Sequence, residues 1–193
     1  MKNISSLLNH LLLVLFAVTP SFALSAERFL DDLSFGVSVL QQESSLTLTT
    51  ADNNTRYTDD ATGIELYAEH YHQGKYRYKG SFAYIAYEGF DITEAVVSAD
   101  LLMPLNPQFS LFAGAASGAA LQQFPEAGVS DSSVGLIYGG QLGGIYYLNR
   151  HLMAELGYRL RLTSLKTEVN GANNSFIEFD QLDEIYISLL LMF

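Results

Sequence analysis

Apolar and polar residues alternate along most of the chain with a period of two. In the segment 183–193, DEIYISLLLMF, the alternate positions Ile185, Ile187, Leu189, Leu191 and Phe193 are all apolar. Successive side chains of a β-strand point to opposite faces, so this segment is predicted to be a strand with one apolar face. The same pattern predicts seven more strands, near 33–42, 62–72, 76–87, 95–103, 109–119, 133–148 and 151–163.

The predicted connections alternate between long and short. The long or polar ones are 43–61, 88–94, 120–132 and 164–181, and the short ones are 73–75, 104–108 and 149–150. Such alternation is typical of an antiparallel barrel with both termini on one side, because odd and even connections then lie at opposite ends. We therefore expect an all-β fold, an eight-stranded antiparallel up-and-down transmembrane β-barrel.

The two faces of the predicted strands differ in charge. One face is apolar and uncharged, whereas the opposite face has serines, glycines and nine charged residues: Glu65, Glu69, Arg77, Lys79, Asp100, Glu155, Arg159, Arg161 and Glu184. A soluble barrel would have its polar face outside, whereas a basic residue facing lipid costs about 2–4 kcal/mol at the bilayer midplane. The apolar face is thus expected to meet lipid. The charged face is expected to form an ionic network that fills the barrel; solvated charge in a narrow polar lumen is the alternative.

A three-residue turn at 73–75 would also fix the register of the two strands beside it. Glu69 would then lie opposite Lys79, and Tyr71 would lie opposite Arg77. Residues directly opposite each other on antiparallel strands are within contact distance. The first of these pairs joins opposite charges on the predicted inner face.

Residues 1–26 have the pattern of a secretory signal peptide. Lys2 precedes the apolar run LLLVLFAV, Pro20 follows it, and small residues place the cleavage site between residues 23 and 26. Residues 27–193 would then form the barrel domain, with 9 basic and 21 acidic residues. This balance disfavours nucleic acid as a partner. No later apolar run reaches the roughly 18 residues of a membrane-spanning helix.

With its leader, its eight alternating segments and its ending IYISLLLMF, the sequence resembles the eight-stranded outer-membrane barrels of Gram-negative bacteria, of the OmpA transmembrane-domain, OmpX and Ail type. The resemblance implies export through the periplasm and insertion as a monomer into the outer membrane, among lipid and lipopolysaccharide. It implies short turns in the periplasm and long loops outside. It also implies that Ile185, Ile187, Leu189, Leu191 and Phe193 are the signal read by the barrel assembly machinery.

Candidate chemistry is sparse in this sequence. Small barrels of this kind include lipid A acyltransferases and deacylases, which as families use histidine, but His70, His72 and His151 all fall at the expected periplasmic end. His70 and His72 share a strand face, yet no third metal ligand is evident. We therefore expect no catalytic, cofactor or metal site. The primary hypothesis is a structural or surface-interaction protein with acidic loops; a narrow passive pore and a lipid A-modifying enzyme are the alternatives.

Overall fold

The computed structural model describes residues 33–50, 53–123, 132–168 and 176–192. The predicted leader, residues 1–26, and the terminal Phe193 of the expected assembly signal lie outside the described residues.

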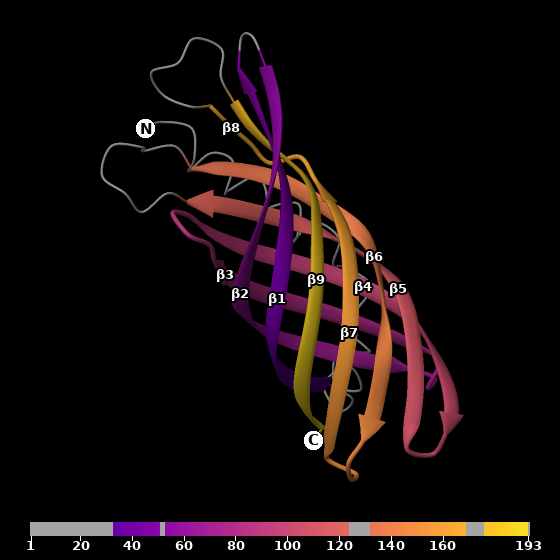
Figure 1. Ribbon diagram of the computed structural model, residues 1–193. Helices are drawn as coiled ribbons and strands as arrows, with labels where there is room; N and C mark the ends of the chain where they lie inside the picture. The colour runs from indigo at the N-terminus through magenta and orange to yellow at the C-terminus, as the bar shows by residue number, and fades with distance from the viewer. Residues whose placement is uncertain (1–32, 51–52, 124–131, 169–175, 193) are drawn as a thin grey trace, which may run out of the picture. The chain divides into compact units, whose positions relative to one another are not determined.

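The described residues form a closed antiparallel β-barrel (Figure 1). Its strands are β1 (Leu33–Thr50), β2 (Asn53–His72), β3 (Tyr76–Ala86), β4 (Asp91–Asn106), β5 (Phe109–Gln123), β6 (Ser133–Tyr147), β7 (Leu152–Thr163), β8 (Lys166–Glu168) and β9 (Phe176–Met192). Neighbours along the chain pair up to β7, which pairs with β9, and β9 pairs with β1 and closes the ring. The short β8 pairs with β9 beyond the end of β7, so the two share one place in the wall. The barrel therefore has eight strands, as the sequence predicts.

Several strands are longer than their apolar pattern suggests. Most of the predicted connection 43–61 is a hairpin, because β1 and β2 stay paired from Leu33 opposite His70 to Thr50 opposite Asn53. Likewise, β4 begins at Asp91 inside the predicted connection 88–94, and β8 lies inside 164–181. Beyond the rim of the barrel, neither face of a strand needs to be continuously apolar. The two-residue apolar pattern is therefore lost there, although the backbone stays extended. In Figure 1 the β1–β2 hairpin extends beyond the other strands.

The register of β2 and β3 is the one expected from the sequence. Glu69 lies opposite Lys79 and Tyr71 opposite Arg77, across a turn closed by the Lys75 amide, which donates to the His72 carbonyl at 3.2 Å. The central residues of that turn, Gln73 and Gly74, have φ of 55° and 64°. Two consecutive positive φ values are typical of a type I′ hairpin turn, and the second position favours glycine.

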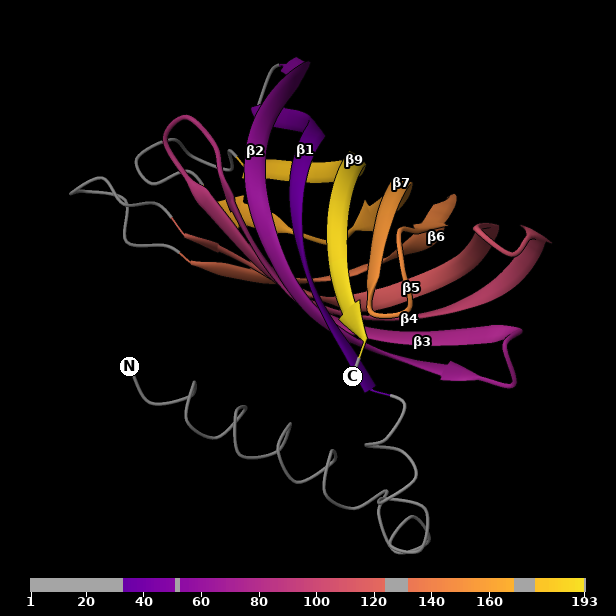
Figure 2. The same ribbon diagram turned by 90° about the horizontal axis from the view of Figure 1, so that it is seen from below.

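The outer surface of the barrel is apolar over a broad belt. Large hydrophobic side chains on this face have relative exposures from 36% to 71%, with Val97, Leu136 and Ile187 among the highest. No helix in the described part of the chain is long and apolar enough to cross a membrane. Figure 2, seen from below, shows the C-terminal strand β9 between β1 and β7.

Buried apolar side chains lie toward both ends of the interior. At the end with the long connections, the upper cap consists of Leu40, Ile85, Tyr87, Phe90, Ile92, Ile137, Leu165, Phe179 and Leu182. Tyr87 stacks on Phe90 with a centroid distance of 4.5 Å, and Phe90 meets the edge of Phe179 at 5.6 Å. At the end with the short turns, the lower cap consists of Leu102, Ile145, Met153 and Leu190. The polar interior lies between these two caps.

Candidate functional site

Ten charged side chains lie buried between the two caps. All nine charged residues that the alternation assigns to the inner face are among them, each at most 4% exposed, and Glu94 is the tenth. We call this set the ionic core: Glu65, Glu69, Arg77, Lys79, Glu94, Asp100, Glu155, Arg159, Arg161 and Glu184. Strands β2, β3, β4, β7 and β9 supply these side chains. The pairing of the ten groups determines whether the interior is an open lumen or a filled one.

Arg77 is the centre of the half of the ionic core that is nearer the lower cap. Its guanidinium donates to Asp100 at 2.7–2.8 Å and forms an ion pair with Glu155. The same group lies 3.5 Å from a Glu69 oxygen. Charge-assisted contacts of this kind are about twice as strong as neutral hydrogen bonds. One buried cation from β3 therefore joins acids from β2, β4 and β7.

A second group of ion pairs lies toward the upper cap. Arg159 binds Glu184 at 2.6 Å and Glu65 at 2.9 Å, while Arg161 binds Glu94 and the other Glu184 oxygen, both at 2.6 Å. Each arginine thus bridges two carboxylates. Both guanidinium groups share Glu184 on β9, so the pairs form one connected chain across the barrel.

Lys79 lies between the two groups of ion pairs. Its ammonium is 3.6 Å from Glu65, 3.6 Å from the centroid of the Tyr67 ring and 5.1 Å from that of Tyr186. The Tyr186 hydroxyl donates to Glu155 at 2.5 Å, which connects this aromatic pair to the Arg77 group. Cations are attracted to the faces of aromatic rings, and more strongly where both groups are desolvated. Lys79 and the two tyrosine rings therefore lie together between the two groups of ion pairs.

The two tyrosine rings have room to lie flat because each covers a glycine on the neighbouring strand. Tyr67 is paired with Gly36, and Tyr186 is paired with Gly157. A Cβ atom at Gly36 would lie 2.2 Å from Tyr67 Cζ, and one at Gly157 would lie 2.3 Å from Tyr186 Cζ. These distances are far shorter than van der Waals contact, so both glycines are required by packing.

Replacing Gly36 with alanine is therefore expected to destabilise the folded barrel by about 1–3 kcal/mol, because the Tyr67 ring must leave its place beside Lys79. Urea unfolding of the refolded protein in detergent micelles, followed by gel mobility, measures this change. Gly140→Ala is the matched control, since a Cβ there meets only the Gly114 carbonyl oxygen at 3.6 Å. Equal unfolding midpoints for both variants would contradict the packing argument.

Glu94 is the member of the ionic core that the sequence analysis missed. The apolar pattern places it in the connection 88–94, whereas β4 begins at Asp91. Glu94 has the same parity as Ser98 and Asp100, so extending the predicted strand 95–103 by one residue places it on the inner face. Its second oxygen accepts from Gln42 at 3.1 Å, and Gln42 accepts from the Tyr87 hydroxyl at 2.7 Å. This contact links the ionic core to the upper cap.

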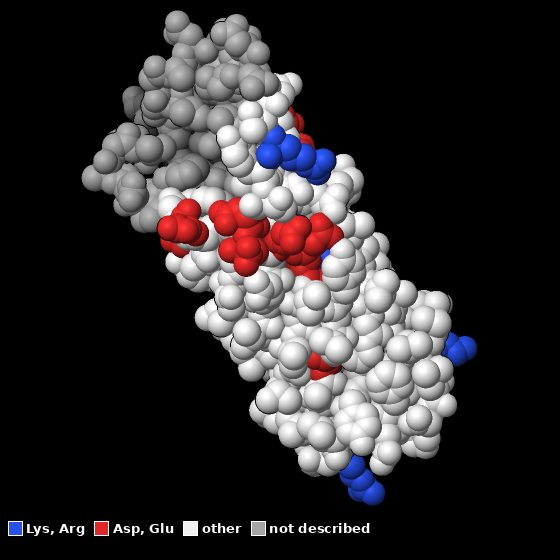
Figure 3. All heavy atoms as spheres, viewed as in Figure 1, with Lys and Arg blue, Asp and Glu red and all other residues white. Residues whose placement is uncertain are grey.

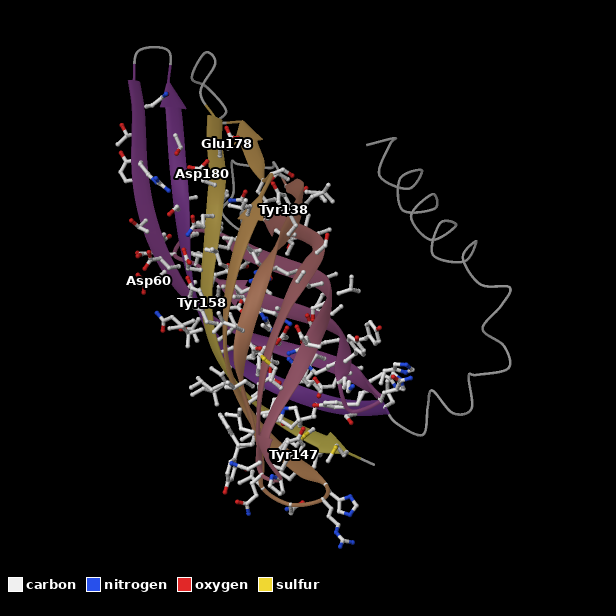
Figure 4. All side chains as sticks on the ribbon, turned by 90° about the vertical axis from the view of Figure 1, so that its right-hand side faces the viewer. Asp60, Tyr138, Tyr147, Tyr158, Glu178 and Asp180 are labelled. Atoms are coloured by element: carbon white, nitrogen blue, oxygen red, sulfur yellow. The ribbon has the colours of Figure 1, made fainter. Side chains whose placement is uncertain are left out.

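An acidic band lies on the outer surface above the apolar belt. Glu43 is paired with Asp60 on one side and with Asp183 on the other, so three carboxylates lie in one row across β2, β1 and β9. Figure 3 shows acidic atoms gathered across the visible face, with a largely uncharged surface below them. Figure 4 shows Glu178 and Asp180 toward the same end and Tyr147 at the opposite end. The Tyr158 hydroxyl donates to Asp183 at the border of the belt.

The described histidines lie at the other end of the barrel. His70 and His72 are near the end of β2, and His151 is in the turn before β7, where its Nδ1 is 3.3 Å from the Met192 carbonyl oxygen. Within the described residues, no group of three or more potential ligands could hold a metal ion. The expectation of no catalytic, cofactor or metal site remains a prediction.

Solved structures of outer-membrane proteins resemble this barrel. The Neisserial surface protein A (NspA) structure has a TM-score of 0.58 at 12% identity, covering 81% of this chain and 97% of that one. Outer membrane protein H (OprH) of P. aeruginosa has a TM-score of 0.55 at 19% identity, covering 84% and 99%. The outer membrane protein AlkL has a TM-score of 0.51 at 12% identity, covering 83% and 88%.

This chain has the fold of the small eight-stranded outer-membrane β-barrels. No protein-family model matches the sequence, and no curated protein matches it either. At these identities the likeness establishes the fold alone. The function of this barrel depends on its own surface and its own ionic core rather than on its fold.

Proposed function

We propose that the chain is a monomeric bacterial outer-membrane protein with a structural or surface-interaction role and a filled interior. Residues 1–26 direct export through the periplasm, and the mature barrel begins at about residue 27. The apolar positions Ile185, Ile187, Leu189 and Leu191 face outward on β9 and, with Phe193, serve as the signal for the barrel assembly machinery. The short turns then face the periplasm and the acidic band faces outward, among lipopolysaccharide.

The ionic core is the observation that carries this proposal. Eight strands enclose little more than the volume of their own side chains. Here those side chains form two groups of ion pairs, one around Arg77 and one around Arg159 and Arg161. Tyr186 links the two groups, because its hydroxyl donates to Glu155 and its ring faces Arg159. The upper and lower caps cover the core with apolar groups at both ends. An ion passing along the axis would have to displace both caps and break buried ion pairs. This arrangement supports a plug rather than a passive pore.

Conductance in planar bilayers tests the filled interior. The purified, refolded barrel is expected to give no steady current above the protein-free membrane, at protein concentrations where gel mobility shows complete folding. Heat-unfolded protein added at the same concentration is the control for nonspecific leakage. A steady, ion-selective current that grows with the amount of folded barrel would support the narrow-pore alternative instead.

The positions of the histidines argue against the enzyme alternative. A general base must come within hydrogen-bond reach of the group that it activates. His70, His72 and His151 lie at the short-turn end, far along the strands from the acidic band. Incubation with lipid A followed by mass analysis is expected to leave the lipid unchanged. Loss or gain of an acyl chain would overturn this expectation.

The acidic band supports a surface role. Carboxylates placed directly opposite one another on neighbouring strands repel, so the row of Asp60, Glu43 and Asp183 is costly unless a partner or solvent cation offsets it. Gln41 donates to Asp60 at 3.2 Å, which satisfies one carboxylate oxygen without neutralising it. Three acidic side chains therefore lie side by side at the edge of the apolar belt.

A further inference from the structure

The lipid-facing surface contains an apolar groove across β1 to β5. Its volume is about 530 Å³, and its lining residues include Phe35, Leu66, Ala68, Gly80, Phe82 and Val97. The groove is shallow and open along the wall rather than enclosed. The groove lies on the outer wall of the barrel, so it is separate from the ionic core.

Small residues form the floor of the groove and large ones form its walls. Ala68 lies opposite Gly80, and Gly80 lies opposite Val97 on its other side, so these three form one row across the strands. A Cβ atom at Gly80 would have no other atom within 4 Å. Phe82 and Leu66 are paired with each other in the next row on the same face and are both more than half exposed. The depression therefore arises from a difference in side-chain size.

The two strands that form this floor lead directly to a cationic turn. From Ala68 and Gly80, the outward face continues through His70 and Tyr78, then through His72 and Tyr76, to Lys75. Gly80 lies five residue steps from Lys75, about 17 Å along the strand at roughly 3.3 Å per residue. For a strand tilted by about 40°, this is about 13 Å along the membrane normal. One leaflet of a membrane contributes about 15 Å of hydrocarbon, half of the roughly 30 Å core. The groove and the turn are thus about one lipid leaflet apart.

Charge at the short-turn end favours an anionic partner. Lys75 and His72 are exposed there, and the turns 73–75, 107–108 and 148–151 contain no acidic residue. The acids of the described segments lie in the ionic core or toward the opposite end of the barrel. Lys is a common ligand for phosphate as a point charge, and aromatic residues such as Tyr76 favour the membrane interface.

Resting on the proposed orientation in the outer membrane, we propose that this face binds a glycerophospholipid of the periplasmic leaflet. Its phosphate lies against Lys75 and His72, and one acyl chain lies in the groove over Ala68 and Gly80. A flexible chain can fill a groove of this size, and apolar contact there replaces a void that would leave the walls without partner atoms.

Native mass spectrometry of the folded barrel in detergent tests the lipid site. Phosphatidylglycerol is the probe, and a diacylglycerol with the same acyl chains is the comparison ligand without phosphate. Lys75→Gln is expected to weaken phosphatidylglycerol binding roughly tenfold and to leave diacylglycerol unchanged. Gly80→Leu fills the floor and is expected to weaken both lipids roughly tenfold, because the acyl chain loses its apolar contacts.

Each variant has a matched control on another part of the barrel. Gly140→Leu adds the same side chain at another outward-facing glycine, where a Cβ meets only the Gly114 carbonyl oxygen at 3.6 Å. Arg150→Gln removes a cation from another short turn. Both controls are expected to bind phosphatidylglycerol like the unsubstituted protein. Equal binding by all four variants, or equal losses in test and control pairs, would overturn the lipid site. Gel mobility of each variant reports folding separately. A barrel that folds but shows no lipid preference would therefore refute the lipid site and leave the proposed function untouched.

Discussion

Replacing Arg77 with glutamine is expected to destabilise the folded barrel by about 3–5 kcal/mol, which is the usual cost of removing one partner from a buried ion pair. Arg77 is fully buried and holds Asp100 and Glu155, with Glu69 3.5 Å away. Without the guanidinium, these carboxylates face one another in a low-dielectric interior. Urea unfolding in micelles, followed by gel mobility, measures the loss.

Two further variants isolate the cause of this destabilisation. Arg77→Lys keeps the charge but loses the planar, bidentate geometry, so its unfolding midpoint should fall between those of Arg77→Gln and the unsubstituted protein. Arg150→Gln, in the turn between β6 and β7, should change stability by no more than about 0.5 kcal/mol. If Arg77→Gln unfolded at the same urea concentration as the unsubstituted barrel, the interior would be hydrated rather than filled by ion pairs.

Placing arginine at Ile64 is expected to cost about 2–4 kcal/mol of folding free energy in phospholipid vesicles, because that side chain would enter hydrocarbon. Ile64 lies on the outward face of β2 and is 58% exposed. The measurement is the fraction of folded barrel at increasing urea concentration in vesicles. The result tests directly whether the apolar belt meets lipid.

Thr58→Arg is the matched control for the vesicle experiment. Thr58 is exposed on the same strand and shares the parity of Ile64, but it lies in the outer part of β2, beyond the residues that pair with β3. There an arginine should reach water or lipid headgroups, and folding should change little. Equal costs at the two positions would show that the belt is not embedded in hydrocarbon.

The sequence predicted the barrel well because alternation is a local property. Each side chain of a strand points to the face set by its parity, so the apolar faces and the charged faces could be separated without knowing any contact. The turn 73–75 also fixed the register of Glu69 and Lys79, as the structure has it. The pattern does not reveal the strand ends near Glu94 and in the outer hairpin, because polar sequence there resembles a connection although the strands continue.

Ion-pair partners could not be predicted from the same pattern. Arg77 meets Glu155 at a separation of 78 residues, and Arg159 meets Glu65 at a separation of 94. These contacts exist because β9 pairs with both β1 and β7 and brings distant strands around one axis. Likewise, the groove depends on the side-by-side placement of Ala68, Gly80 and Val97 from three strands.

The sequence by itself determined the strands, their faces and the apolar belt, since these follow from the two-residue period of the extended backbone. Only the tertiary structure decided which buried charges meet, where the apolar caps lie and where the outer wall is hollow. Those features depend on how far each strand is shifted against its neighbours when the sheet closes, and that shift is a property of the whole ring.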